Sequence, residues 1–176
     1  MIRVWDSFVR AFHWALALTF AVAWLSSEHL ERLHDAAGYV AGALVAARVV
    51  WGFVGTGYAR FSQFIRSPET VAGYLKAIAD GSERRFIGHN PAGGAMIVVL
   101  LGAMAAAAAS GWLLTTDAFW GSTAAQRAHS LMAHGVLLLV LLHLGGVALA
   151  SVRHRENLVR AMVIGVKRPA GPGDVA

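Results

Sequence analysis

Four long segments with few charged residues constrain this chain more than any other feature. They occupy residues 8–27, 34–56, 91–114 and 128–152. A helix of about 20 apolar residues crosses a hydrocarbon core of roughly 30 Å, so each segment is long enough to span a membrane. The whole chain is 57% hydrophobic and only 14% charged, which is typical of a membrane-embedded protein. The sequence therefore predicts an all-α integral membrane protein, a four-helix bundle with up-down topology.

The basic residues predict how these helices are oriented. Twelve of the fifteen Lys and Arg residues lie on the side that holds both termini and the connection 59–90, whereas the two opposite loops contain only Arg32 and Arg127. Such an excess marks the cytoplasmic side, so both termini are predicted to be cytoplasmic. We expect a multi-pass protein of the bacterial inner membrane. The net charge of +5 then fits lipid headgroups, and no nucleic-acid partner is expected.

Residues 1–168 are predicted to form a single transmembrane domain. The first segment is expected to be retained, because "AWLSSEHLERLHD" at its end does not resemble a signal cleavage site. Within the connection, Ser67 and Pro68 open a short amphipathic pattern that stops at Gly81, which predicts a surface helix at about residues 67–80. Residues 169–176, rich in Pro and Gly, are predicted to be a disordered tail.

The chain contains no cysteine. This excludes disulfides, thiolate zinc sites, iron–sulfur clusters and covalent haem attachment through a C-x-x-C-H motif. Any metal chemistry must therefore depend on histidine, carboxylate or methionine ligands.

Three histidines lie in the apolar run "RAHSLMAHGVLLLVLLH". His129 and His143 are fourteen residues apart, so on a helix they lie within about 40° of one face and about 21 Å apart along the axis. His134 precedes His143 by nine residues and is turned by about 180°, away from that face. The pattern indicates one site near each membrane surface, with His134 outside both. For His134, an interhelical hydrogen bond or a quinone contact stay open as alternatives to a plain packing role.

Two further histidines lie at matching depths. His13 is near the cytoplasmic start of the first segment, level with His143, and His34 starts the second segment level with His129. Two imidazoles without carboxylate or thiol partners, inside a four-helix bundle, suit the two axial positions of an iron porphyrin. The spacing therefore predicts two b-type haems, one held by His13 and His143 and the other by His34 and His129.

Arg48 and Gly38 belong to the same hypothesis. Arg48 follows His34 by fourteen residues, which places it on the same face at the depth of the cytoplasmic pair. A haem propionate there would offset an otherwise costly charge. Gly38, one turn after His34, leaves room for a flat macrocycle, as does the glycine of "MAAAAASG" in the third segment.

The chain resembles the prokaryotic dihaem cytochrome b561 family, which also holds the b-type cytochrome subunit of nickel-iron hydrogenases. The resemblance rests on "VWDSFVRAFHW", "LHDAAGYVAGALVAARVVWGF", "GHNPAGGAMIVVLL" and "AHSLMAHGVLLLVLLHLGGVALASVRHRENLVRAMVIG", which occur in the family's order and cover nearly the whole chain to about Lys167. It implies a four-helix cytochrome with two haem b groups on His13, His34, His129 and His143. His134 departs from the pattern expected in relatives.

The resemblance implies electron transfer between the quinone pool and a redox partner such as a periplasmic cytochrome, a dehydrogenase or a hydrogenase. The chain would be an electron-transfer protein or a subunit of an oxidoreductase complex, with quinone as an exchangeable substrate. An alternative is a stand-alone quinol-dependent oxidoreductase that reacts with a small oxidant such as superoxide. The residues alone also leave open a histidine-lined metal transporter and a structural membrane adaptor.

Overall fold

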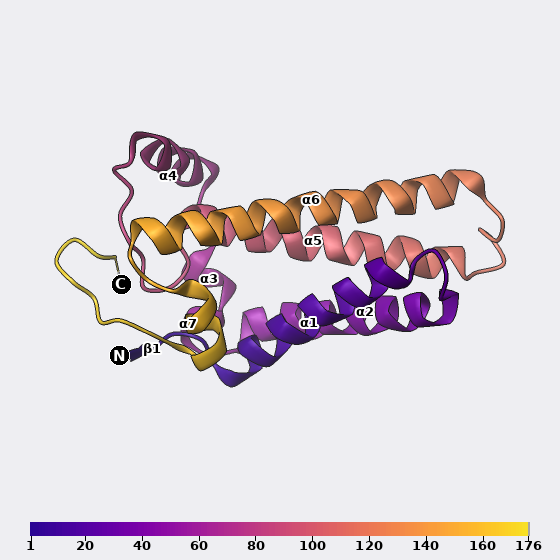
Figure 1. The fold of residues 1–176 in the computed structure, drawn as a ribbon, viewed down its shortest axis with the longest axis horizontal. Coiled ribbons are helices and arrows are strands. Elements are labelled where there is room, and N and C mark those ends of the chain that lie inside the picture. The colour runs from indigo at the N-terminus through magenta and orange to yellow at the C-terminus, as the bar shows by residue number, and fades with distance from the viewer. Residues whose placement is uncertain (176) are drawn as a thin grey trace. The chain divides into compact units, whose positions relative to one another are not determined.

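The structure, a computed structural model, describes residues 1–175. Within these residues, helices long and apolar enough to cross a membrane are α1 (Ser7–Ser26), α2 (Glu31–Val54), α5 (Pro91–Leu114) and α6 (Thr123–Arg153) (Figure 1). They coincide with the four predicted segments, which confirms the all-α membrane fold. Helix α6 begins earlier than predicted because Ser122 caps it, its hydroxyl oxygen accepting a hydrogen bond of 3.3 Å from the Ala125 amide.

The shorter elements are β1 (Ile2–Arg3), the 3₁₀ turn η1 (Gly57–Ala59), α3 (Phe61–Phe64), α4 (Pro68–Asp80), α7 (Leu158–Ile164) and β2 (Val166–Lys167). Helix α4 occupies the residues for which the sequence predicts a short helix. Its first turn is capped by Ser67, whose hydroxyl accepts from the Thr70 amide at 3.4 Å. Helix α7 was not predicted; the Asn157 side chain caps its start by accepting from the Arg160 amide at 2.7 Å.

The chain divides into two compact units, which are described separately. Unit 1 comprises residues 1–10, 50–98 and the described residues from 141 onward, and unit 2 comprises residues 11–49 and 99–140. Each of the four long helices contributes residues to both units.

Unit 2 is a four-helix bundle built from parts of α1, α2, α5 and α6. Polar or aromatic contacts join these helices in a closed ring. His34 of α2 contacts Ala23 of α1, and Tyr39 of α2 contacts Thr115 at the end of α5. Ser110 of α5 contacts His129 of α6, and His134 of α6 contacts Trp24 of α1.

The inner face of α2 in unit 2 is made of small residues and one arginine. Ala37, Ala41, Val45 and Arg48 are all buried, at spacings of three and four residues that keep them on one side of the helix. On α6, Val136 is fully buried and lies midway between His129 and His143, seven residues from each. The α6 face that carries these two histidines therefore points inward at Val136.

Unit 1 brings the N-terminal residues against the segments around α3, α5 and α7. Strand β1 pairs antiparallel with β2, with Ile2 opposite Lys167. The adjoining hydrophobic cluster contains the buried side chains of Val4, Trp5 and Ile87. Asp6 starts α1 by accepting a hydrogen bond of 2.7 Å from the Val9 amide.

A buried polar cluster holds the C-terminal residues of unit 1. We name Arg85, Glu156, Lys167 and Asp174 the C-terminal polar cluster. The Arg85 guanidinium contacts the Glu156 carboxylate at 2.7 Å and the Asp174 carboxylate at 2.5 Å, and Lys167 Nζ lies 3.9 Å from Glu156. Burial alone would raise the pKa of Glu156, but hydrogen bonds from Arg85 and the Arg168 amide hold it below its usual value. Burial lowers the pKa of Lys167 to about 8.

Residues 171–175 have specific partners, although their composition predicts disorder. The Val175 amide donates to the Arg85 carbonyl at 2.8 Å, and the Ile87 amide donates to the Val175 carbonyl at 2.9 Å. The Asp174 carboxylate also accepts from the Gly171 amide at 2.9 Å, which closes a turn. These bonds satisfy backbone groups that a free tail would leave to water.

Candidate functional site

The rings of His34 and His129 lie near each other within the four-helix bundle of unit 2. Their ring centroids are 6.0 Å apart and the ring planes are inclined by 87°. His34 comes from the first turns of α2 and His129 from the second turn of α6, so the two rings approach from separate helices. Both side chains are partly buried.

The Nδ1 atom of each ring is held by a hydrogen-bond partner. His34 Nδ1 lies 2.8 Å from the Ala23 carbonyl oxygen, which can only accept, so Nδ1 carries the proton. His129 Nδ1 lies 2.9 Å from the Ser110 hydroxyl oxygen. With Nδ1 engaged on each ring, Nε2 is the nitrogen available to bind a metal.

This arrangement fits an iron porphyrin with two axial imidazoles. Imidazole nitrogens bind transition metals at about 2 Å, so two ligands on opposite sides of one metal have ring centroids about 6 Å apart. The 6.0 Å separation of His34 and His129 matches this requirement. A histidine ligand also commonly donates its second ring N–H to a carbonyl or another acceptor, which orients the ring, as seen for His34.

Two glycines near this pair have different surroundings. Gly38 borders an apolar groove of about 530 Å³ between α2 and α5, and a Cβ at this position would meet no atom within 4 Å. The space beside the backbone is therefore open, and its use by a macrocycle remains a prediction. At Gly111, a Cβ would lie 3.1 Å from His129 Cε1. Gly111 thus allows the His129 ring to lie close to α5.

Arg48 is buried on the inner face of α2, with only 3% of its surface exposed. It shares this face with Ala37, Ala41 and Val45, as the fourteen-residue spacing from His34 predicts. A guanidinium at this position, inside a helix of membrane length, is well suited to an anionic group of a cofactor.

His13 lies in the α1 part of unit 2, and His143 lies in the α6 part of unit 1. Each is partly buried. Their pairing across the two units stays a prediction from the sequence. His134 is exposed, donates from Nδ1 to the Ser130 carbonyl of its own helix at 2.7 Å, and packs its ring against Trp24.

Sequence reasoning missed two residues near candidate ligands or motifs. One is Ser110, a single serine at the end of a run of alanines, which gives no spacing signal in the sequence. The other is His89, whose ring in unit 1 packs against Trp5 and Phe64, with centroids 4.5 and 4.8 Å away. The neighbouring Asn90 does cap α5, accepting from the Gly93 amide at 2.7 Å.

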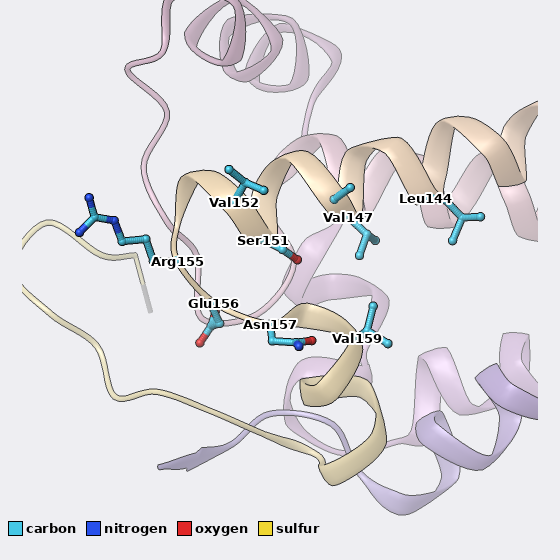
Figure 2. Close-up of a pocket in the computed structure, with 9 residues that line it drawn as sticks. Leu144, Val147, Ser151, Val152, Arg155, Glu156, Asn157 and Val159 are labelled. Atoms are coloured by element: carbon cyan, nitrogen blue, oxygen red, sulfur yellow. The ribbon is translucent and has the colours of Figure 1, made fainter.

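A second groove, of about 520 Å³, lies in unit 1 where α6 ends and α7 begins (Figure 2). Its polar groups have roles in the fold: Ser151 accepts from the Leu158 amide, Asn157 caps α7, and Glu156 binds Arg85. Arg155 extends away from the other labelled side chains (Figure 2). None of the six predicted site residues lines this groove.

Four apolar helices of membrane length, with histidines rather than thiolates available as iron ligands, define the class of membrane b-type cytochromes. The chain belongs to the prokaryotic cytochrome b561 family, because the sequence model of that family matches residues 4–165. It is therefore a multi-pass bacterial membrane protein that binds haem b and takes part in electron transfer. No curated protein and no solved structure matches the chain.

Proposed function

We propose that this chain is a dihaem cytochrome b of the bacterial inner membrane that carries electrons between the quinone pool and a periplasmic redox partner. The observation that carries the proposal is the His34 and His129 pair, with rings 6.0 Å apart and both Nδ1 atoms engaged in hydrogen bonds. Membership of the cytochrome b561 family supports haem b as the cofactor.

The residues of the chain would bind and orient the cofactors. His34 and His129 would hold the periplasmic haem, and His13 and His143 would hold the cytoplasmic one. Arg48 would bind a propionate of the cytoplasmic haem, and Gly38 would leave space beside α2. Haem b, when bound, supplies a one-electron couple. With two histidines assigned to each haem, the haems would pass electrons rather than bind dioxygen or substrate.

The proposed topology assigns one haem to each side of the membrane. With both termini cytoplasmic, as the distribution of basic residues supports, His129 lies toward the periplasm and His143 toward the cytoplasm. Quinone would exchange electrons at one haem and a periplasmic cytochrome, dehydrogenase or hydrogenase at the other. The fourteen-residue spacing corresponds to about 21 Å along α6, most of the hydrocarbon thickness.

Haem content tests the proposal directly. Purified protein is expected to contain two non-covalent protohaems per chain, measured as pyridine haemochrome against protein concentration from amino-acid analysis. Absorption spectra should be low-spin in both redox states because each iron has two imidazoles. One haem per chain, or a high-spin ferrous spectrum, would contradict the pairing.

Arg48→Leu is expected to affect the cytoplasmic haem alone. Removing a cation beside a propionate disfavours the reduced iron, so the midpoint potential of that haem should fall by on the order of 60 mV, a tenfold change in a one-electron equilibrium. Redox titration of the purified variant measures this. Arg48→Lys, which keeps the charge, serves as the matched control, and in this variant the midpoint potential should fall less. Equal loss of both haems in Arg48→Leu would indicate a folding role instead.

A further inference from the structure

Ser110 makes a directed hydrogen bond to one of the candidate ligands. Its hydroxyl oxygen lies 2.9 Å from the Ala107 carbonyl oxygen of its own helix and 2.9 Å from His129 Nδ1. A serine hydroxyl has a single proton, and the carbonyl can only accept, so that proton goes to Ala107. The Ser110 oxygen is then the acceptor for His129 Nδ1–H.

The His129 ring is also confined on a second side. A Cβ on Gly111 would come within 3.1 Å of His129 Cε1, so the ring lies close against the α5 backbone next to Ser110. Consecutive residues of α5 thus provide a hydrogen-bond acceptor and a close backbone surface. Together they restrict both the tautomer and the orientation of the imidazole.

We propose that Ser110 is a positioning residue that fixes His129 as an Nε2 ligand and tunes the reduction potential of the haem that His129 holds. The inference depends on the proposed binding of haem by His34 and His129. A hydrogen-bond acceptor on Nδ1–H makes an imidazole a stronger electron donor, which favours the oxidised iron and lowers the potential.

The two ligands differ in how their Nδ1 partners can be changed. His34 donates to a backbone carbonyl, that of Ala23, which survives most substitutions. His129 donates to the Ser110 side chain, which a single substitution removes, while the Ala107 backbone that also interacts with His129 stays in place. Ser110 is therefore a position where the potential of this haem can be adjusted without changing a ligand.

The test compares Ser110→Ala with Ser110→Thr in redox titrations of the purified holoprotein, with haem content measured in parallel. The wave of the His129 haem is identified as the one lost in His34→Ala. In Ser110→Ala this wave should move to a higher potential while the second wave stays unchanged. Ser110→Thr keeps the hydroxyl and should restore the wild-type value. The control is Thr19→Val, which removes a hydroxyl that donates within α1, to the Ala15 carbonyl, and should move neither wave.

Each outcome has a defined meaning. Loss of the His129 haem in Ser110→Ala, with retention in Ser110→Thr, would also support the positioning role. An unchanged potential at full haem content in Ser110→Ala would overturn the inference and leave the proposed function intact. Equal shifts or equal haem loss in both Ser110 variants would overturn it too, by assigning the residue a packing role. A His34→Ala variant that keeps both haems would contradict the proposed function itself.

Discussion

His129→Ala removes one of the two haems from the purified protein, and His143→Ala removes the other; these are the expected results. Each remaining centre should keep its low-spin spectrum, because the two histidines belong to different proposed pairs. The buried Val136 between them supports an inward face for this side of α6. The measurement is haem content with redox titration for each variant.

His134→Ala is the matched control from the same helix. It should keep both haems, because His134 is exposed and its Nδ1 bonds to its own helix. Haem loss in His134→Ala together with two haems in His129→Ala would mean that the periplasmic ligand was misassigned.

Arg85→Leu is expected to destabilise unit 1 by about 3–5 kcal/mol. Breaking a buried ion pair by removing one partner leaves the remaining charges uncompensated, and here Glu156 and Asp174 would both lose the guanidinium. The residues from 166 onward should then detach. Trypsin in detergent solution measures this: Lys167, buried in the wild type, becomes a cleavage site, and intact mass shows loss of the residues from 168 onward.

Arg84→Leu is the control for this variant. Arg84 is exposed and donates one hydrogen bond of 2.9 Å to the Gly173 carbonyl, so its loss should cost about 1 kcal/mol. Similar cleavage rates in the two variants would contradict the role of the C-terminal polar cluster.

Acid should weaken the same contacts in the wild type. The pKa of Glu156 is lower in the folded protein than its ordinary value of 4.5, so its stabilising contribution is present above that value and is lost as the pH falls through the folded pKa.

The sequence predicted the membrane helices well because length and hydropathy determine them almost alone. Helix α5 starts at Pro91, as the predicted segment 91–114 does, and Asn90 caps it there. The inward position of Arg48 followed from its spacing to His34, since a helix fixes the face of each residue.

Features that depend on distant partners could not be predicted. The composition of residues 169–176 indicates disorder, and nothing local shows that Asp174 binds Arg85, 89 residues earlier. The hydrogen bond of Ser110 to His129 likewise depends on how α5 packs against α6. Helix α7, of seven residues, is too short to show a periodic pattern.

The pairing of β1 with β2 and of Arg85 with Asp174 has a consequence for biosynthesis. Chains are synthesised from the N-terminus, so all residues of the bundle of unit 2, which ends at Val140, leave the ribosome before residues 166–175. Unit 1 cannot close until those later residues emerge, because they supply β2 and the Asp174 carboxylate. The bundle of unit 2 can therefore be complete before unit 1 is, and His34 and His129 can meet before the N-terminal strand has its partner.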